Sequence, residues 1–354
     1  MCQPFAPLFQ KYTLIILVNI AYFKWYFSAV DKEVLIVYND FITSKKRGIF
    51  MLKALLLKMT HIIPDALYLK LRYYMRFHQK LNLKNPRTFS EKLQWLKLYD
   101  RRPEYSMMVD KYEVKKYVAD IIGEEYIIPT LNVWNSFDEI DFDTLPNQFV
   151  LKCTHDSGGL VICKDKSKLD MEKLKKKIDR VLKSNYYWHG REWPYKNVKP
   201  RIIAEQFMED KCNEETNDGD AGKEDKGLIN YKFFCFNGEP RFLYLSQDFG
   251  NHDSMKVSFV TMDWKFAPYK RSDFESFDRL PEKPVKFDEM VQLSKVLSKD
   301  YNFLRVDLYQ INNKIYFSEL TFSPTSGFIP FENTEHDLEI GEMFELPSEK
   351  RKGN

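Results

Sequence analysis

Two alternating segments near the C-terminus, residues 303–309 and 315–321, constrain the fold of this chain most strongly. In the first segment every second residue is apolar, which predicts a strand with one buried face. Arg305 and Asp307 fall on its opposite face. The second segment alternates in the same way, and the residues expected on one of its faces are Ile315, Phe317, Glu319 and Thr321. The connection between the segments is short, so they are predicted to form an antiparallel hairpin.

The register of this hairpin decides whether it can hold a metal ion. A three-residue connection would place Asp307 directly across from Glu319, with Cβ atoms ~5 Å apart. Two carboxylates that close repel each other unless a cation lies between them, and Mg²⁺ prefers one or two carboxylates plus substrate phosphates. The hairpin therefore predicts a floor for Mg²⁺ and ATP, with Arg305 placed for a phosphate or an acyl-phosphate. A two-residue turn at Asn312-Asn313 would shift the register and favour a plain acidic pair on a surface hairpin.

A lysine inside an apolar strand points to the same chemistry. Lys152 lies in the apolar run 148–153, where an ammonium group is costly unless it meets a partner. The turn Ser157-Gly158-Gly159 follows, and such a turn can bring backbone N–H groups close to an anion. Together they predict a strand lysine and a mobile loop that hold nucleotide phosphates. The order of residues that defines a P-loop is absent.

Two further features are weak when each is taken alone. Residues 202–208 read as an edge strand whose Glu205 and backbone, up to Phe207 and Met208, could meet the rim of an adenine ring. A plain strand with an exposed glutamate is the alternative. Lys111 stands at the expected start of a helix and could bring another cation to the phosphates, whereas a surface lysine is the alternative.

The other expected elements are shorter signals. Residues 60–118 read mainly as helix, with a capping box from Thr88 to Glu91, and the helix that begins at Asp110 should stop near Gly123. Asn237-Gly238 predicts a β-hairpin. The remaining expected strands are residues 132–134, 148–153, 160–163, 201–208, 231–236 and 240–246, and the expected lysine-rich surface helix is 167–184. The aromatic run 186–195 could stack a sugar or cover ATP, or simply pack as a loop core.

The order of Lys111, Lys152 with its glycine loop, Glu205, and the paired carboxylates resembles the ATP-grasp superfamily. A closer resemblance is to its TupA-like branch, which is named for teichuronopeptide biosynthesis and is met among bacterial surface-polysaccharide enzymes. The resemblance covers roughly residues 51–345. The strings that carry it are Asn85-Pro-Arg-Thr-Phe-Ser-Glu-Lys, Phe149-Val-Leu-Lys-Cys-Thr-His-Asp-Ser-Gly-Gly, Tyr231-Lys-Phe-Phe-Cys-Phe-Asn-Gly-Glu-Pro and Phe317-Ser-Glu-Leu-Thr-Phe.

The resemblance implies an α+β fold in which two lobes sandwich the nucleotide, preceded by a helical N-terminal region. The parts that follow from it are an N-terminal extension (1–50), a helical region (51–108), a first lobe with the glycine loop (109–208), a second lobe with the metal hairpin (209–347) and a tail (348–354).

The resemblance also implies roles for single residues. Lys111, Lys152 and Lys232 would neutralise ATP phosphates. The segment from Glu205 to Met208 would form the adenine hinge, and Asp307 and Glu319 would hold Mg²⁺. The superfamily usually has Asn where Thr321 stands, so Thr321 is expected to be a weaker metal ligand. Family members commonly carry Asp in place of Asn230, which leaves the role of that position open.

The implied reaction is ATP-dependent joining of a carboxylate to an amine through an acyl-phosphate. The expected substrates are an amino acid or amine and an acidic polysaccharide or lipid-linked glycan. A glycosyltransferase of the same pathway is the alternative, for which Asp141-Phe142-Asp143 has the spacing of a metal-binding motif. A nucleotide sensor or scaffold without catalysis is a third hypothesis.

Composition excludes several classes. The chain has 54 basic and 51 acidic residues, a net charge of +3, so no nucleic-acid partner is expected. Five cysteines without a CxxC motif, and six histidines without HExxH spacing, argue against a zinc site and for a reduced, cytoplasmic setting.

The first residues of the sequence leave a question about membranes. Residues 12–23 are apolar but too short to span a bilayer, and no cleavage pattern indicates secretion. The extension 1–50 is either membrane-proximal or foreign to a native chain that starts at Met51. Lys53 and Lys58 lie on an apolar helix that could rest on the inner face of the membrane, or pack on the protein's own core.

Overall fold

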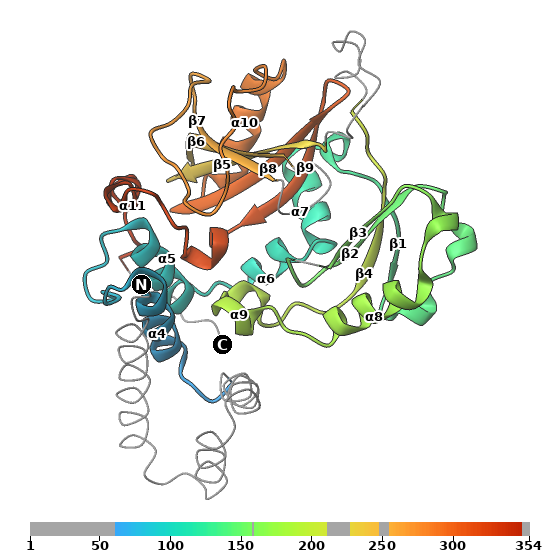
Figure 1. Ribbon diagram of the computed structural model, residues 1–354, viewed down its shortest axis with the longest axis horizontal. Helices are drawn as coiled ribbons and strands as arrows, with labels where there is room; N and C mark the ends of the chain where they lie inside the picture. Colours follow the sequence, from blue (N-terminus) through green and yellow to red (C-terminus); the bar gives the residue numbers. More distant parts are fainter. Residues whose placement is uncertain (1–60, 158, 211–226, 248–254, 349–354) are drawn as a thin grey trace, which may run out of the picture. The chain divides into compact units, whose positions relative to one another are not determined.

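The computed structural model describes residues 61–157, 159–210, 227–247 and 255–348. The predictions for the extension 1–50, for Lys53 and Lys58, for Gly158 and for most of the tail lie outside these ranges. The chain divides into two units, Met1–Pro64 and Asp65–Asn354, and both sheets belong to the second unit. This unit is a mixed α+β structure with two antiparallel sheets, as expected for the predicted fold class (Figure 1).

The first sheet has four strands in the order β1-β4-β2-β3. Their bounds are β1 Thr130–Trp134, β4 Ile202–Gln206, β2 Phe149–Cys153 and β3 Leu160–Cys163. One face is apolar and packs against helix α8 (Met171–Leu182) through Leu174 and Ile178. Because Val150 pairs with Glu205 and Lys152 with Ile203, Lys152 and Glu205 share the other face. The sheet therefore presents these two charged side chains away from α8.

The second sheet has five strands in the order β7-β6-β5-β8-β9. Their bounds are β7 Lys256–Thr261, β6 Glu239–Gln247, β5 Ile229–Phe236, β8 Phe303–Ile311 and β9 Lys314–Thr321. One face forms a core with the helices α6 (Glu104–Val109), α7 (Glu113–Ile122) and α10 (Phe287–Ser298). The other face is divided into an apolar half, rich in phenylalanine, and a polar half. That polar half becomes important below.

Two helices cover the apolar half. Helices α5 (Phe89–Tyr99) and α11 (Thr334–Glu342) bring Phe89, Leu93 and Ile340 onto the sheet. The predicted capping box is present, because Thr88 and Glu91 each accept a hydrogen bond from the other's backbone N–H. Helix α4 (Asp65–Phe77) packs beside α5 in a small cluster of its own. The remaining short elements are α9 Tyr187–Gly190 and the 3₁₀ turns Glu124–Tyr126, Phe137–Glu139, Phe142–Thr144, Lys166–Lys168, Trp193–Tyr195 and Pro324–Gly327.

The predicted strands are present with shifts of one or two residues at their ends. The Asn237-Gly238 hairpin is confirmed, with φ of 50° and 79° at its two turn residues. Strand β7 and helix α10 were not predicted from the sequence. The lysine-rich helix begins later than expected, at Met171, because Asp170 accepts a hydrogen bond from the N–H of Lys173 and caps it.

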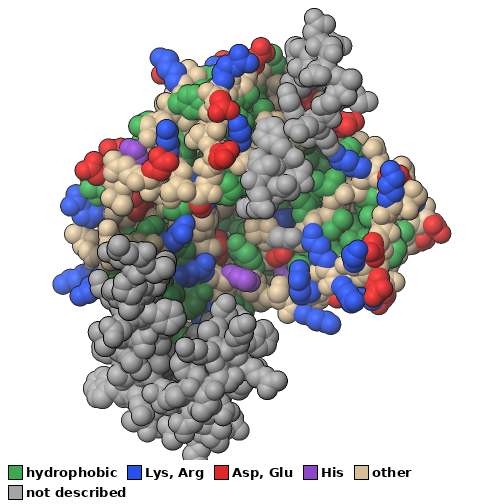
Figure 2. Space-filling model, in the orientation of Figure 1, with side chains coloured by type: hydrophobic (Ala, Val, Ile, Leu, Met, Phe, Trp, Pro, Cys, Tyr) green, Lys and Arg blue, Asp and Glu red, His purple; other side chains and the backbone are tan. Residues whose placement is uncertain are grey.

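The surface of the lysine-rich helix is mixed in charge. Its lysines gather at one edge of the visible face with acidic side chains among them (Figure 2). Lys173 pairs with Asp170 at 3.0 Å, and Lys176 pairs with Glu172 at 3.2 Å. In the aromatic run, Tyr187, Trp193 and Tyr195 are buried, so this segment contributes to the core. Among the helices that the structure describes, none combines the length and hydrophobicity needed to cross a membrane.

We expect Asp337, on helix α11, to make stability depend on pH. Burial raises the pKa of Asp337 to about 6, against hydrogen bonds from the amide and hydroxyl of Ser90, both at 2.9 Å. The folded state thus holds the proton of Asp337 more tightly than the unfolded state does. The stability that this protonation adds is fully present below pH 3.8 and is lost as the pH rises to about 6. Asp337→Asn keeps an acceptor for Ser90 and cannot ionise, so it should be about 1–3 kcal/mol more stable than the native protein at pH 7. Urea unfolding checks this, and an equal difference at pH 4 would contradict it.

Candidate active site

The hairpin that carries the acidic pair has an unexpected geometry. Its turn is the two-residue Asn312-Asn313, with φ of 51° and 61°, and not the three-residue loop on which the predicted pairing depended. The strands pair from Ile311 and Lys314, but a bulge interrupts the register between Asp307 and Leu308. One extra residue, Ser318, is accommodated there, and Asp307 therefore lies opposite Glu319 after all. The prediction of the pair is confirmed, although the condition attached to it was wrong.

The bulge also changes which side chains share a face. Ile315 and Phe317 lie in the core cluster together with Leu320. Glu319 instead shares its face with Thr321, whose hydroxyl donates to Glu319 Oε1 at 3.1 Å. The prediction that Glu319 and Thr321 share a face with Ile315 and Phe317 was wrong, because an inserted residue reverses the alternation.

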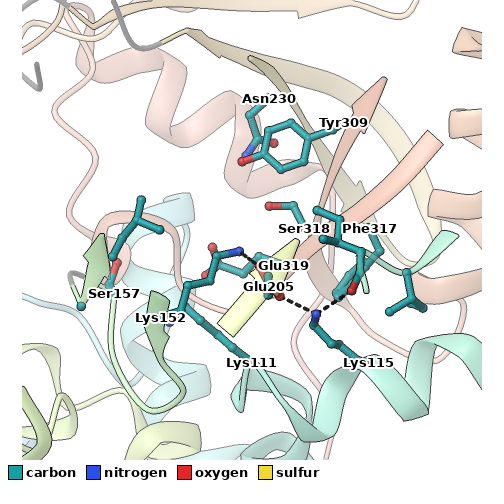
Figure 3. Close-up of a pocket in the computed structure, with 14 residues that line it drawn as sticks. Lys111, Lys115, Lys152, Ser157, Glu205, Asn230, Tyr309, Phe317, Ser318 and Glu319 are labelled. Carbon is teal, nitrogen blue, oxygen red and sulfur yellow. Dashed lines mark hydrogen bonds and ion pairs between the residues drawn. The ribbon is translucent and has the colours of Figure 1, made fainter. Parts of the chain in front are cut away.

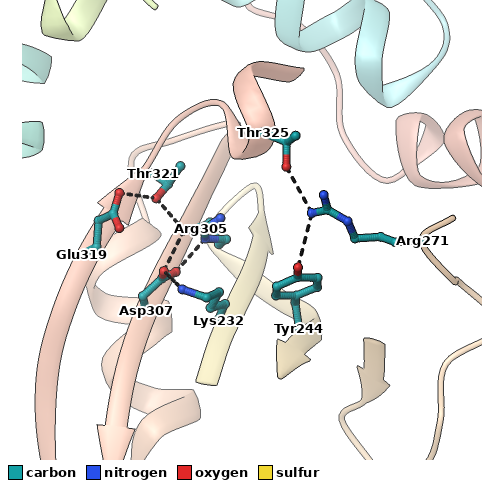
Figure 4. A network of polar contacts seen from close by, with 8 residues as sticks. All are labelled: Lys232, Tyr244, Arg271, Arg305, Asp307, Glu319, Thr321 and Thr325. Carbon is teal, nitrogen blue, oxygen red and sulfur yellow. Dashed lines mark hydrogen bonds and ion pairs between the residues drawn. The ribbon is translucent and has the colours of Figure 1, made fainter. Parts of the chain in front are cut away.

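A row of polar residues crosses four strands of the second sheet. The strand registers place Tyr244 (β6), Lys232 (β5), Asp307 (β8) and Glu319 (β9) side by side in that order. Figure 4 shows these side chains on one face of the sheet, with Arg305 and Thr321 beside them. This row is the polar half of the sheet face that α5 and α11 leave uncovered.

Asp307 is buried at the centre of this row and is fully paired. Arg305 donates from Nε to one carboxylate oxygen and from Nη2 to the other, both at 2.7 Å. Lys232 donates to the second oxygen at 2.8 Å. Burial opposes the charge of Asp307, but Arg305 and Lys232 outweigh it and hold the pKa of the carboxyl below its usual value. In this state Arg305 and Lys232, expected to contact phosphates, neutralise Asp307.

A cavity of about 170 Å³ lies beside Glu319 (Figure 3). Its lining combines charged and apolar side chains from the first sheet, the second sheet and the start of α7. The lining residues are Lys111, Lys115, Ile127, Ile128, Lys152, Ser157, Gly159, Leu160, Glu205, Asn230, Tyr309, Phe317, Ser318 and Glu319. The structure thus brings together Lys111, Lys152, Glu205 and Glu319, which are separated widely in the sequence. Both predicted lobes contribute to this one cavity.

Three lysines and a buried glutamate determine the electrostatics of the cavity. Glu205 is 4% exposed and receives Lys152 on one carboxylate oxygen and Lys115 on the other, each at 2.5 Å. Burial works against all these charges, yet the two lysines hold the pKa of Glu205 below its usual value. Burial lowers the pKa of Lys115, although Glu205 opposes the shift. Burial also works against the charge of Lys152, but Glu205 raises its pKa above the usual value.

Lys111 is tied to the glycine loop. Its Nζ donates to the carbonyl oxygen of Asp156, and its backbone N–H donates to the carbonyl of Thr154 at 3.1 Å. Burial lowers the pKa of Lys111, and Glu319 is the strongest of the groups that oppose this shift. The loop closes tightly at Gly159, because a Cβ there would come within 2.8 Å of the Cβ of Cys153. Gly159 is therefore required at the end of the loop, where the backbone passes close to β2 before β3 begins. Ser157 lies at the rim of the cavity.

The donor set of the cavity fits a polyanionic ligand. Three ammonium groups face two carboxylates, Glu205 and Glu319, which leaves an excess of one positive charge. In addition, Asn230 is 9% exposed, and in the described residues its Oδ1 has no hydrogen-bond partner. A buried polar atom without a partner in a cavity wall calls for water or a ligand. The cavity is smaller than the 300–1,000 Å³ usual for cofactor sites.

A magnesium ion fits this donor set at Glu319 better than at Asp307. No group of three or more potential metal-binding side chains occurs in the part of the chain that the structure describes. Mg²⁺ needs only one or two protein carboxylates when phosphates supply the rest. Glu319 is half-buried and contacts only the hydroxyl of Thr321 among the described residues. Asp307 already accepts three hydrogen bonds from Arg305 and Lys232, so it would have to share its oxygens between these cations and the ion.

Several residues that were candidates for ligand or metal binding do not line the cavity. Phe207 and Met208 follow the end of β4 and do not line the cavity. Asp141 and Asp143 belong to a 3₁₀ turn, where Asp141 accepts from the N–H of Asp143 at 3.0 Å, and neither lines the cavity. Sequence reasoning missed Lys115, although it follows Lys111 by four residues, which is one turn of a helix. That spacing was the available signal.

Comparisons with known proteins identify the family of this chain. The model of the TupA-like ATP-grasp family matches residues 91–345. No curated protein sequence gives a significant match. Among solved structures, the ATP complex of D-alanine–D-alanine ligase from Bacillus anthracis has 14% identity and a TM-score of 0.34, covering 61% of this chain and 55% of that chain. The same ligase from Helicobacter pylori has 17% identity and a TM-score of 0.34, covering 73% and 69%. The ATP-grasp ligase PsnB with minimal precursor, Mg and ADP has 9% identity and a TM-score of 0.34, covering 70% and 60%.

Proposed function

The chain belongs to the TupA-like ATP-grasp family, and on that premise we propose that it is an ATP-dependent carboxylate–amine ligase that acts through an acyl-phosphate. One observation carries the proposal: a single cavity is lined by Lys152 of the first sheet, Glu319 of the second sheet, and Lys111 and Lys115 at the start of α7. A triphosphate needs several cationic contacts and a metal-binding carboxylate within the same space. A nucleotide sensor would not need Glu319 next to Asp307 in the polar row of the second sheet.

ATP binding, in this proposal, exchanges one set of partners for another. Lys111, Lys115 and Lys152 would turn from Glu205 and Asp156 to phosphate oxygens, and Ile127 and Leu160 would contact the base. Mg²⁺, held by Glu319 with Asp307 and Thr321 nearby, would supply charge neutralisation between the β- and γ-phosphates.

The chemical steps of the proposal are those of a ligase that forms an acyl-phosphate. An oxygen of the substrate carboxylate attacks the γ-phosphorus, the bond to the β-phosphate oxygen breaks, and ADP leaves. The amine nitrogen then attacks the acyl carbon, inorganic phosphate leaves, and the nitrogen loses a proton. Arg305 and Lys232 lie where the acyl-phosphate would carry its charge, and the Ser157–Gly159 loop would exclude water from it.

The substrates are proposed from the family. The carboxylate would belong to an acidic polysaccharide or a lipid-linked glycan, and the amine to an amino acid or a simple amine. Work on such acceptors would place the protein in the cytoplasm at the inner face of the membrane. Phe207 and Met208 would contact the adenine only if the base extends past the cavity.

Nucleotide preference tests this proposal against the glycosyltransferase alternative. We expect Mg²⁺ with ATP to raise the melting temperature by several degrees, because a ligand at 100 times its Kd adds about 2.7 kcal/mol of stability. UDP- and GDP-sugars should give no shift, since Asp141 and Asp143 do not line the cavity described above. A thermal-shift assay with each nucleotide provides the measurement. Stabilisation by a nucleotide sugar without stabilisation by ATP would reject the ligase assignment, and release of AMP in place of ADP would reject the acyl-phosphate.

A further inference from the structure

A second group of polar side chains lies beyond Tyr244, at the far end of the polar row from Glu319. Figure 4 shows Arg271 with its guanidinium directed toward Tyr244 and Thr325. Arg271 Nη1 donates to the hydroxyl oxygen of Tyr244 at 3.3 Å and to that of Thr325 at 3.1 Å. These three residues are called the Arg271 cluster below. They come from β6, from the segment between β7 and α10, and from the turn after β9.

The other edge of this guanidinium is already neutralised. Nε and Nη2 of Arg271 each bind one carboxylate oxygen of Asp273, both at 2.8 Å. The ring of Phe274 lies 4.7 Å from the guanidinium carbon. The side chain of Arg271 is only 8% exposed, so its position is fixed by packing. One edge of the cation is therefore left to two hydroxyl groups.

The turn that carries Thr325 is held in a strained conformation. Thr325 and Ser326 have φ of 51° and 55°, in the left-handed region that costs non-glycine residues about 1–3 kcal/mol each. Side chains from elsewhere in the chain hold the turn in place. Lys97 donates to the carbonyl of Ser326 at 2.8 Å, and the hydroxyl of Ser326 donates to Glu192 at 2.6 Å. Strain that is held in this way concentrates at ligand sites, and here it fixes the Thr325 hydroxyl against Arg271.

Charge and hydrogen bonding select the group that this cluster could bind. Asp273 offsets the charge of Arg271, so the remaining field suits a single negative charge better than the dianion of a phosphate. Both hydrogens of Nη1 are donated to Tyr244 and Thr325, so a carboxylate oxygen would replace a hydroxyl as the acceptor of Nη1, and the two hydroxyls could then donate to the carboxylate themselves. Thr325 is exposed and gives access from solvent.

Distance separates this group from the carboxylate that would be activated. Tyr244 and Glu319 lie three strand positions apart in the row, which corresponds to ~14 Å at the usual strand spacing. One carboxylate cannot contact Glu319 and the Arg271 cluster at the same time. A carboxylate bound at Arg271 would therefore be a different one from the carboxylate that is activated.

On the premise of the ligase function, we propose that Arg271, Tyr244 and Thr325 bind the carboxylate of the amine substrate. The amine substrate is then an amino acid, and not a simple amine. Its amino group would point along the row toward Arg305 and the acyl-phosphate, while its carboxylate is held at the far end.

The experiment measures binding to the full chain loaded with Mg²⁺ and a non-hydrolysable ATP analogue. The probes are the twenty amino acids, the amines that lack their carboxylate, and glucuronate. At least one amino acid should raise the melting temperature of the loaded protein, and its decarboxylated amine should not. Arg271→Gln should weaken the apparent affinity for that amino acid by about 10–100-fold, the effect of losing a charge-assisted hydrogen bond. The shift produced by the ATP analogue should stay unchanged.

Companion variants separate binding from folding. Thr325→Gly removes the hydroxyl and relieves the strain, so it should weaken amino-acid binding without loss of stability, whereas Thr325→Ser should retain binding. The single change Arg271→Gln leaves Asp273 without its main cationic partner. The double variant Arg271→Gln/Asp273→Asn removes that unpaired charge as well. Arg76→Gln is the matched control, because Arg76 lies 3.8 Å from Asp273 but contacts neither hydroxyl.

Four results would overturn the proposal. They are the absence of any amino-acid shift in the loaded protein, equal shifts with the decarboxylated amines, unchanged affinity in Arg271→Gln, and a glucuronate shift that Arg271→Gln abolishes in place of an amino-acid shift. A protein that fails to bind the ATP analogue would instead reject the ligase function itself.

Discussion

Replacing Glu319 by glutamine should reduce ATP-dependent turnover by about 10³-fold or more while the protein stays folded. The polar row contains two acids. Asp307 forms ion pairs with Lys232 and Arg305, whereas among the described residues no lysine or arginine forms an ion pair with Glu319. Loss of its charge removes the metal-binding carboxylate, and a bound metal ion contributes several kcal/mol to stabilisation of charge in the transition state. The fold should tolerate the change, because glutamine still accepts the hydrogen bond from Thr321.

The measurement is ADP release alongside the melting temperature. Glu172→Gln on α8 is the matched control, since Glu172 is 82% exposed and pairs only with Lys176 among the described residues. It should leave both quantities unchanged. Turnover within tenfold of the native rate in Glu319→Gln would remove Glu319 from the metal site, and with it the main support for the ligase.

Replacing Asp307 by alanine should instead destabilise the protein by about 3–5 kcal/mol, which is the range found when one partner of a buried ion pair is removed. Asp307 is 0% exposed, and its loss leaves Arg305 and Lys232 buried without a counter-charge. The melting temperature should fall by about 2–4 °C for each kcal/mol in a domain of this size. Turnover would also fall, in proportion to the loss of folded protein, and it would fall further if Asp307 contributes to metal binding.

An exposed ion pair of the same length provides the comparison. Asp278 lies 2.7 Å from Lys256 and is 90% exposed, so Asp278→Ala should leave the melting temperature almost unchanged. Adding Lys232→Met to Asp307→Ala should recover part of the lost stability, since it removes one uncompensated charge. If Asp307→Ala unfolds at the same temperature as Asp278→Ala, the buried network does not contribute as described.

The sequence was sufficient for every described strand except β7 and for six of the fourteen residues that line the cavity, for identifiable reasons. Lys152 stands out because a charge in an apolar strand needs a partner, and the structure supplies Glu205. The capping box at Thr88 and the Asn237-Gly238 hairpin are local features, so local residues predict them. Lys115 was missed because its significance depends on β4, which pairs with the lysine only in the folded chain. The Arg271 cluster is likewise assembled from three segments that share no sequence pattern.

The closing hairpin shows where pattern reasoning fails in physical terms. Strict alternation assigns every residue of β9 to a face once the turn is known. Ser318 adds one residue to one strand only, and no local propensity marks it as a bulge. The predicted pair of Asp307 and Glu319 was right because two errors, in the turn length and in the alternation, compensated each other.

The position of Ser318 has a consequence for how related hairpins should be aligned. Residues between the turn and the bulge pair with β8 in one register, and residues after the bulge pair in a register shifted by one residue. An alignment anchored at Asn312-Asn313 will therefore match the acid of a hairpin without the bulge to Ser318 and not to Glu319. Anchoring at the C-terminal end of β9 keeps the acids in step, and gaps in such alignments belong at position 318, with the turn left intact.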